Sequence, residues 1–405
     1  MSAAPAPVAG LWGRALVLSL GAAVSLGVTR FAYGLLLPPM REDLAWSYTL
    51  AGAMNTANAA GYLLGALWMP RLLRRWRPGQ VLRAGMLLAA LFMALSGFVT
   101  DPWALMWQRL LAGWASALVF VAGGLLAAGL AQQRPHQGGW LIGLYYGGTG
   151  WGIVVSALVV PWVLHRSADW PQAWWALAVA CALASVALWR TVGGLDHQHG
   201  QGATDSRDEG VRFELSQWVL GLAGYGCFGI GYIGYMTFVI ALLREQGASG
   251  STITFFYASL GLAVVVSARL WARLLDHFKG GEALAILNAL LAVATLVPAL
   301  AAPAWALGVS GLLFGAVFLS VVASTTVMVR HNLPMSEWAR GISAFTIVFA
   351  VGQIIGPTLV GWVADGPGGL ARGLACSAAV LLLGALLAWR QRPLPHRRAG
   401  NPVVD

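Results

Sequence analysis

The chain has 405 residues, of which 58% are hydrophobic and only 10% are charged. A soluble domain carries about 25% charged residues, so this composition excludes a water-soluble globular protein and indicates that lipid surrounds most of the chain. The formal net charge of +10 does not indicate a nucleic-acid partner, because the basic residues lie in short loops between apolar stretches, a pattern typical of membrane orientation.

Apolar stretches near 20 residues are long enough to cross a bilayer core of about 30 Å as helices. Arg14 and the apolar residues after it resemble a secretory signal, but the apolar run continues to Pro38, and we expect it to be retained as the first span. The sequence therefore predicts an all-α membrane protein with twelve transmembrane helices. The expected spans are residues 14–38, 50–70, 81–99, 103–131, 139–163, 171–190, 216–243, 252–272, 282–300, 304–330, 339–363 and 370–390.

One long polar stretch interrupts this series, and it has too few apolar residues to fold alone. It separates six spans from six. We expect an N-terminal six-helix half over residues 1–190, a cytoplasmic linker over 191–215, a C-terminal six-helix half over 216–390 and a cytoplasmic tail over 391–405.

Basic residues predict the orientation of the spans. Most of the 25 Lys and Arg residues fall in loops on one side, which also holds both termini. Cytoplasmic loops are enriched in Lys and Arg, so we expect both termini in the cytoplasm. The opposite side has only Arg41, Arg166, Arg244 and Arg372.

The two predicted halves resemble each other. The segment 70–82 resembles the segment that starts 202 positions later (70 to 272), and Tyr33 pairs with Tyr235 at the same offset. Because six spans are an even number, the second half enters the membrane in the same orientation as the first. The halves are therefore expected to be parallel repeats around an axis along the membrane normal.

Twelve spans, a central linker and a basic loop after the second span together resemble the major facilitator superfamily. Within it, the segments Thr29–Tyr33 (TRFAY), Leu36–Met40 (LLPPM) and Gly61–Gly65 (GYLLG) are similar to the bacterial YbfB/YjiJ branch. The resemblance implies a secondary transporter in the bacterial inner membrane. The superfamily's Asp and Gly after the second span are missing, with Met69 and Leu72 in that region, so an acidic latch there is not implied.

Two arginines, Arg30 and Arg109, lie deep within predicted spans, away from the span ends, and no carboxylate does. A charge in the membrane centre costs roughly 2.5–3.5 kcal/mol and usually marks a pathway. Guanidinium groups bind carboxylate or phosphate through two parallel hydrogen bonds, so the missing partner is expected to be an anionic substrate. The alternative is that each arginine bonds backbone carbonyls or acids at the rim.

Polar side chains on other spans complete the predicted substrate site. Tyr232 takes the position of Arg30 in the second half, so the site is expected to be cationic on one side and aromatic on the other. For each of these residues packing or a bond to a neighbouring helix is the alternative. The full set of predicted substrate-binding residues is Arg30, Tyr33, Asn58, Arg109, Tyr232, Tyr235, Thr325 and Gln353.

The favoured function is movement of a small organic solute by alternating access, with an organic anion as the first candidate for the solute. Efflux of neutral or cationic compounds, such as drugs or sugars, is the alternative, followed by a membrane-embedded enzyme or a sensor. The histidines lie at loops or span ends and no phosphate-binding loop is present, so we expect no enzyme activity, no metal and no cofactor. The expected partners are the substrate and the lipid bilayer, without nucleic acid, and the chain is expected to be a monomer.

Overall fold

The computed structural model describes all residues except 1–7, 168, 193–212, 301–302 and 395–405. Within the described residues all regular secondary structure is helical, which confirms the all-α prediction. The first half of the chain contains α1 (Val8–Ala22), η1 (Ala23–Val28), α2 (Tyr33–Asp43), α3 (Tyr48–Leu73), α4 (Pro78–Ser96), α5 (Pro102–Gln132), η2 (Pro135–Gln137), α6 (Gly138–Ser167) and α7 (Trp170–Val192). The second half contains α8 (Leu215–Glu245), α9 (Gly250–Leu270), α10 (Ala272–His277), α11 (Glu282–Ala299), α12 (Ala304–Asn332), η4 (Met335–Glu337), α13 (Trp338–Ala364) and α14 (Gly369–Trp389).

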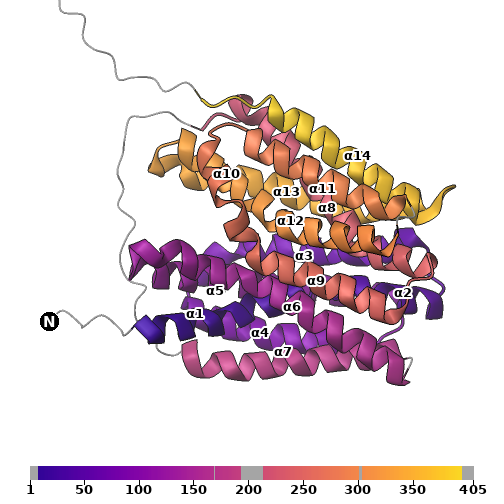
Figure 1. The fold of residues 1–405 in the computed structure, drawn as a ribbon. Coiled ribbons are helices and arrows are strands. Elements are labelled where there is room, and N and C mark those ends of the chain that lie inside the picture. The colour runs from indigo at the N-terminus through magenta and orange to yellow at the C-terminus, as the bar shows by residue number, and fades with distance from the viewer. Residues whose placement is uncertain (1–7, 168, 193–212, 301–302, 395–405) are drawn as a thin grey trace, which may run out of the picture.

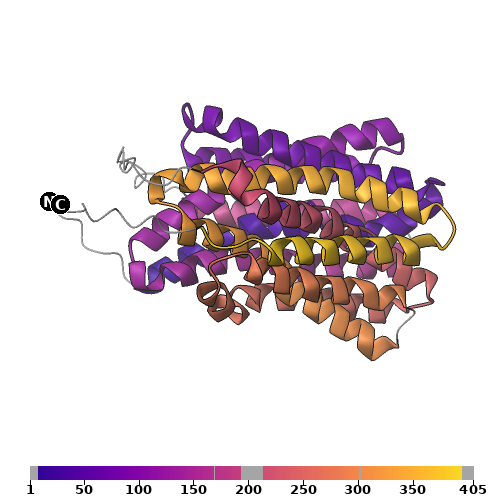
Figure 2. The same ribbon diagram turned by 90° about the horizontal axis from the view of Figure 1, so that it is seen from above.

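The long helices lie side by side along one direction, with the first half below and the second half above in Figure 1. Figure 2 shows the same bundle turned by 90°. One end of the bundle, on the left of Figure 1, holds the start of α1 and α8 and the end of α14. We call it the linker end and the opposite end the far end. The predicted linker falls almost entirely outside the described residues, as does most of the predicted tail.

Eleven of the described helical stretches are long and apolar enough to cross a membrane by length and composition. The remaining long helix, α3, has 26 residues and so is long enough to span, but it is not in this set. Its buried amides Asn55 and Asn58 lower its hydropathy. In the bundle α3 packs against α5 on one side and against α13 on the other.

The first span is not the continuous helix that the sequence predicts. After α1 the backbone widens into the π-helical segment η1, then turns over residues 29–32 before α2 begins. The amide of Thr29 bonds the carbonyl of Val24 at 2.9 Å, and the amide of Phe31 bonds that of Leu26 at 3.0 Å. This five-residue spacing is that of a π-helix, which occurs frequently at functional sites. We call residues 23–32 the break.

The two halves meet mainly through α3 with α13, α6 with α9, and α2 with α8. Glycine permits the closest approaches: a Cβ on Gly52 of α3 would overlap the carbonyl oxygen of Pro357 in α13. Likewise, a Cβ on Gly150 of α6 would overlap the carbonyl oxygen of Gly261 in α9. Small residues allow such backbone contact between helices in lipid, where no hydrophobic force drives helices together.

Candidate functional site

Arg30 lies in the break of the first span, where the halves meet. Its side chain is 3% exposed, and its Nε and Nη2 atoms are buried without a hydrogen-bond partner among the described residues. The guanidinium carbon is 5.9 Å from the ring centroid of Tyr62 in α3. Its charge also acts on the hydroxyl of Tyr232 in α8. Arg30 is therefore a buried cation with unused donors, close to aromatic residues of both halves.

Arg109 in α5 is buried in a different manner. Its Nη1 donates to the carbonyl oxygen of Thr29 at 3.0 Å, while Nε and Nη2 have no hydrogen-bond partner. The guanidinium carbon lies 5.0 Å from the ring centroid of Tyr33 and 5.5 Å from that of Trp174. Aromatic faces attract cations, so Arg109 is held by two rings and by one carbonyl of the break. Backbone bonding was the alternative for both arginines, and Arg109 makes such a bond.

Neither arginine has an acidic partner within the described part of the chain. There the one salt bridge joins Arg340 to Glu337 at 3.5 Å, on α13 and the turn before it. The charges of Arg30 and Arg109 also act on each other. Two buried like charges without a carboxylate leave this region with an unbalanced positive potential. Among the same residues no group of three His, Cys, Asp or Glu side chains is arranged to hold a metal.

Tyr232 and Gln353 come together on the second half, where the sequence predicts both in the site. The hydroxyl of Tyr232 donates to Oε1 of Gln353 at 2.7 Å, across α8 and α13. The Tyr232 ring stacks on Phe228, Phe318 and Phe349, with centroid distances of 4.8, 6.0 and 5.6 Å. Aromatic side chains from α8, α12 and α13 thus form a continuous wall on the side of the second half.

The other predicted residues use their polar groups within their own half. Arg30 and Tyr33 have different partners: the guanidinium of Arg30 lies near the ring of Tyr62, and the ring of Tyr33 lies near the guanidinium of Arg109. In the first half, the hydroxyl of Tyr33 donates to the Ala51 carbonyl at 2.8 Å, and Nδ2 of Asn58 donates to the Arg109 carbonyl at 3.1 Å. In the second half, the hydroxyl of Thr325 donates to the Val322 carbonyl at 3.0 Å, and the hydroxyls of Tyr235 and Ser310 share a hydrogen bond of 2.8 Å.

Three further polar residues lie near this region, and two of them, Tyr62 and Tyr257, are not among the residues that the sequence singles out. Tyr62 lies one helical turn after Asn58, and that spacing places both on one side of α3. Nδ2 of Asn55 donates to the Thr237 hydroxyl at 2.7 Å, and the hydroxyl of Tyr257 donates to the Phe31 carbonyl at 2.7 Å. Both bonds cross from one half to the other. The 202-residue offset between the halves pairs Asn55 with Tyr257 and was the signal that could have found Tyr257.

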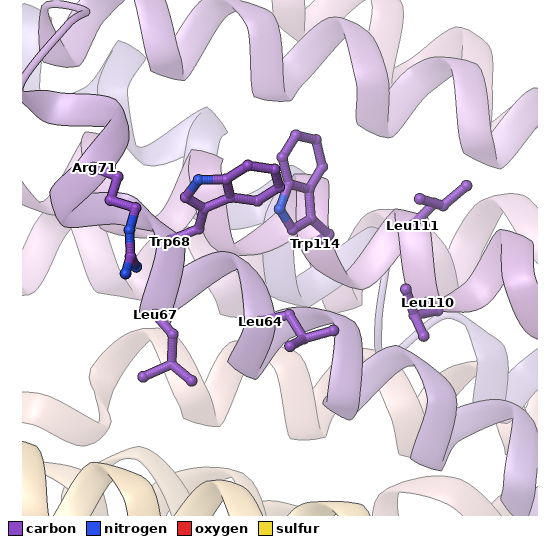
Figure 3. A pocket seen from close by; sticks show the side chains of 7 residues that line it. All are labelled: Leu64, Leu67, Trp68, Arg71, Leu110, Leu111 and Trp114. Atoms are coloured by element: carbon purple, nitrogen blue, oxygen red, sulfur yellow. The ribbon is translucent and has the colours of Figure 1, made fainter.

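A separate groove lies on the outer face of α3 and α5 (Figure 3). It has a volume of about 640 Å³, and its side chains are mostly exposed and apolar, with Trp68 beside Trp114. None of the predicted substrate-binding residues lines it. In a membrane such a surface faces lipid, so the groove is separate from the region around Arg30. Its lining residues are Leu64, Leu67, Trp68, Arg71, Leu110, Leu111 and Trp114.

The bundle is similar to solved transporters. A bacterial homologue of the human lysosomal transporter Spinster matches with a TM-score of 0.70 and 13% identity, over 95% of this chain and 97% of that one. The nucleoside transporter NupG matches with a TM-score of 0.67 and 14% identity, over 94% and 98%. At these identities the likeness is one of fold: twelve transmembrane helices in two parallel six-helix repeats.

Two curated relatives have names that refer to resistance or transport. A "Chloramphenicol resistance protein" of Streptomyces lividans is 24% identical over 383 residues, which cover 91% of this chain and 94% of that protein. A "Putative tartrate transporter" of Agrobacterium vitis is 28% identical over 151 residues, 36% of this chain and 33% of that protein. The family model described as "Uncharacterised MFS-type transporter YbfB" matches residues 22–389. The chain is therefore a multi-pass membrane transporter of the major facilitator superfamily and belongs to its YbfB family.

Proposed function

We propose that this transporter carries a small organic anion by alternating access and that Arg30 is the group that binds the anion. The observation that carries the proposal is the buried guanidinium of Arg30: among the described residues its Nε and Nη2 have no partner, and it has no bond to a backbone carbonyl like the one that Arg109 makes to Thr29. Buried polar groups are nearly always hydrogen-bonded, and a buried charge is costly unless it is paired. A carboxylate would satisfy both requirements through two parallel hydrogen bonds.

The surroundings of Arg30 support an organic anion over a small inorganic one. The aromatic wall around Tyr232 lies on the other half, where it offers apolar area to a carbon skeleton. Gln353 supplies amide donors beside that wall, since its Oε1 already accepts from Tyr232. We propose that Tyr62, Tyr232 and Gln353 contact the substrate, while Arg109, Tyr33 and Asn58 hold the helices that carry the site.

The proposed transport cycle is a rocking of the two halves around Arg30. At the far end the two halves are joined by hydrogen bonds from the backbone amides of Tyr48 and Thr49 in α3 to the carboxylate of Asp365 after α13. We propose that the linker end faces the cytoplasm, because it carries the arginine-rich turn from Arg71 to Arg77. Both termini would then be cytoplasmic, and the chain would act in the bacterial inner membrane as a monomeric carrier, not as an enzyme.

Export of a neutral aromatic compound is the second candidate. It is favoured by the same aromatic wall and by the name of the Streptomyces relative, a chloramphenicol resistance protein. In that case Arg30 would have a structural or gating role. The two candidates differ in whether binding depends on the positive charge of Arg30.

The test is a thermal-shift screen of the purified protein with mono- and dicarboxylates, including tartrate and benzoate, together with neutral sugars, chloramphenicol and cationic drugs. Arg30→Gln removes the buried positive charge. Arg74→Gln is the matched control, because it removes an exposed positive charge at the end of α3. A charge-assisted hydrogen bond contributes about 1.5–3 kcal/mol, so Arg30→Gln should weaken binding of a carboxylate by about 10- to 100-fold. Stabilisation by neutral compounds alone, unchanged in Arg30→Gln, would support the second candidate instead.

A further inference from the structure

Tyr257 connects the second half of the protein to the residue next to Arg30. Its side chain is fully buried in α9, and its hydroxyl donates to the carbonyl oxygen of Phe31 at 2.7 Å. The ring of Phe31 also packs edge-on against Phe318 of α12, with centroids 5.8 Å apart. The backbone and the side chain of Phe31 are therefore both held by the second half.

The carbonyls on either side of Arg30 accept side-chain hydrogen bonds from different halves. The carbonyl of Thr29 accepts from Arg109 of the first half. The carbonyl of Phe31 accepts from Tyr257 of the second half at 2.7 Å, in addition to a longer bond of 3.2 Å from the backbone amide of Gly34. In lipid, carbonyls released by a helix break need donors from neighbouring helices, because no water is present to serve them. The backbone position of Arg30 is thus set by one side-chain donor from each half.

The bond from Tyr257 has a counterpart in the repeated half. Asn55 corresponds to Tyr257 at the 202-residue offset (55 to 257), and its Nδ2 donates across the halves to Thr237 of α8. Each donor comes from the second long helix of its half and reaches the first span of the other half. Each lies seven residues from the far-end start of its helix (48 to 55 and 250 to 257), which is about 10 Å at 1.5 Å per residue. Parting of the halves at the far end would therefore separate both pairs.

We infer that Tyr257 is a positioning residue for Arg30, which holds the arginine in place while the far end is closed and releases its backbone when the far end opens. The inference rests on the proposed role of Arg30 as the anion-binding group. The consequence is that the position of Arg30 would differ between the state that is open to one side of the membrane and the state that is open to the other. The affinity for an anion would then differ between the two states without any further charged residue.

Amide hydrogen exchange of the protein in lipid nanodiscs tests the inference without any ligand. Tyr257→Phe removes only the hydroxyl, and the amides of residues 29–32 should then exchange about fivefold faster, the factor expected for one ordinary hydrogen bond. Tyr145→Phe is the matched control. The hydroxyl of Tyr145 is also buried and donates to a backbone carbonyl, that of Phe120, at 2.8 Å, but within the first half. The control should leave residues 29–32 unchanged.

A double variant tests the link to the far end. Asp365→Ala removes a carboxylate that joins the halves there, so it should also raise exchange at residues 29–32. If both changes break the same bond, amide exchange at residues 29–32 in the double variant Tyr257→Phe with Asp365→Ala should be no faster than in either single variant, since the effects of coupled sites are not additive. Unchanged exchange in either single variant, additive effects, or faster exchange spread over all helices in Tyr257→Phe would overturn the inference.

The anion screen provides a separate readout. With tartrate or benzoate as the probe, whichever depends on Arg30, the Tyr257→Phe protein should need a several-fold higher concentration for half of the thermal shift and reach the same maximum. If the unmodified protein responds to no anion, the proposed function fails. The exchange experiment still decides whether Tyr257 positions residues 29–32.

Discussion

The carboxylate of Asp365 binds Thr49 twice across the boundary between the two halves. Its Oδ2 accepts from the backbone amide of Thr49 at 2.9 Å and from the Thr49 hydroxyl at 2.6 Å. Its Oδ1 accepts from the backbone amide of Tyr48 at 2.7 Å. Amides in the first turn of a helix have no acceptor within the helix, so a residue of the second half caps α3 of the first. Parting of the two halves at the far end would break this contact.

Replacing Asp365 by alanine should loosen the far end. Loss of a helix cap costs about 1 kcal/mol, which corresponds to a roughly fivefold shift toward the open state. A cysteine placed at Thr358, which lies against Thr56 between α3 and α13, reports the opening by its rate of alkylation in a protein otherwise free of cysteine. Asp101→Ala is the control, because Asp101 caps α5 within one half through the amide of Ala104 at 2.8 Å. Equal rates in the two variants would contradict the gating role.

The contribution of Asp365 to stability should depend on pH in a defined direction. Burial alone would raise the pKa of the carboxyl, but hydrogen bonds from Thr49 and Tyr48 and the charge of Arg41 outweigh it and hold the pKa below its usual value. A lowered pKa means that the stabilisation is present above the unfolded value of about 3.9 and disappears as the pH falls through the folded value. The difference in melting temperature between the unmodified protein and Asp365→Ala should be constant from about pH 8 to 5 and shrink below about pH 4. A difference that shrinks near neutral pH would exclude this carboxyl as the cause.

The sequence predicted the features that follow from composition and periodicity. Apolar stretches gave the helices, and the rarity of charge in those stretches singled out Arg30 and Arg109. The offset between the halves also placed Tyr232 at the position of Arg30, and both side chains are buried in the structure. These predictions depend on local sequence or on the repeat, and both can be read without coordinates.

The break in the first span could not be predicted, because tertiary contact produces it. Gly27 lies against Gly152 of α6 so closely that a Cβ would clash with its backbone, and the carbonyls of the break are bonded by Arg109 and Tyr257. None of these partners is near residue 27 in the sequence. The different surroundings of the two arginines depend on the same contacts, so the sequence assigned both the same role.

Gly61→Ala should destabilise the contact between α3 and α5. A Cβ on Gly61 would overlap the carbonyl oxygen of Leu110, so the helices would have to move apart. Overpacking of this kind costs about 1–3 kcal/mol, and the melting temperature of the purified protein should fall accordingly. Gly308→Ala is the control, because nothing lies within 4 Å of its added methyl group. Similar melting temperatures for both variants would mean that α3 and α5 adjust freely.

Lysine substitutions should separate the roles of the two buried arginines. Lysine keeps the charge but lacks the planar fork of arginine. Arg109→Lys should lower the melting temperature, because it loses the geometry that bonds the Thr29 carbonyl and lies near the rings of Tyr33 and Trp174. An unsatisfied buried acceptor costs about 1–3 kcal/mol.

Arg30→Lys should leave the stability of the protein nearly unchanged and weaken anion binding instead. Nε and Nη2 of Arg30 make no hydrogen bond to any residue that the structure describes, so the melting temperature without ligand should change little. Binding of a carboxylate should weaken, because a two-pronged contact is no longer available. Thermal unfolding of both variants, with and without the anion found in the screen, measures both effects. If Arg109→Lys is as stable as the unmodified protein and loses only anion binding, then Arg109 contacts the substrate directly and the division of roles is wrong.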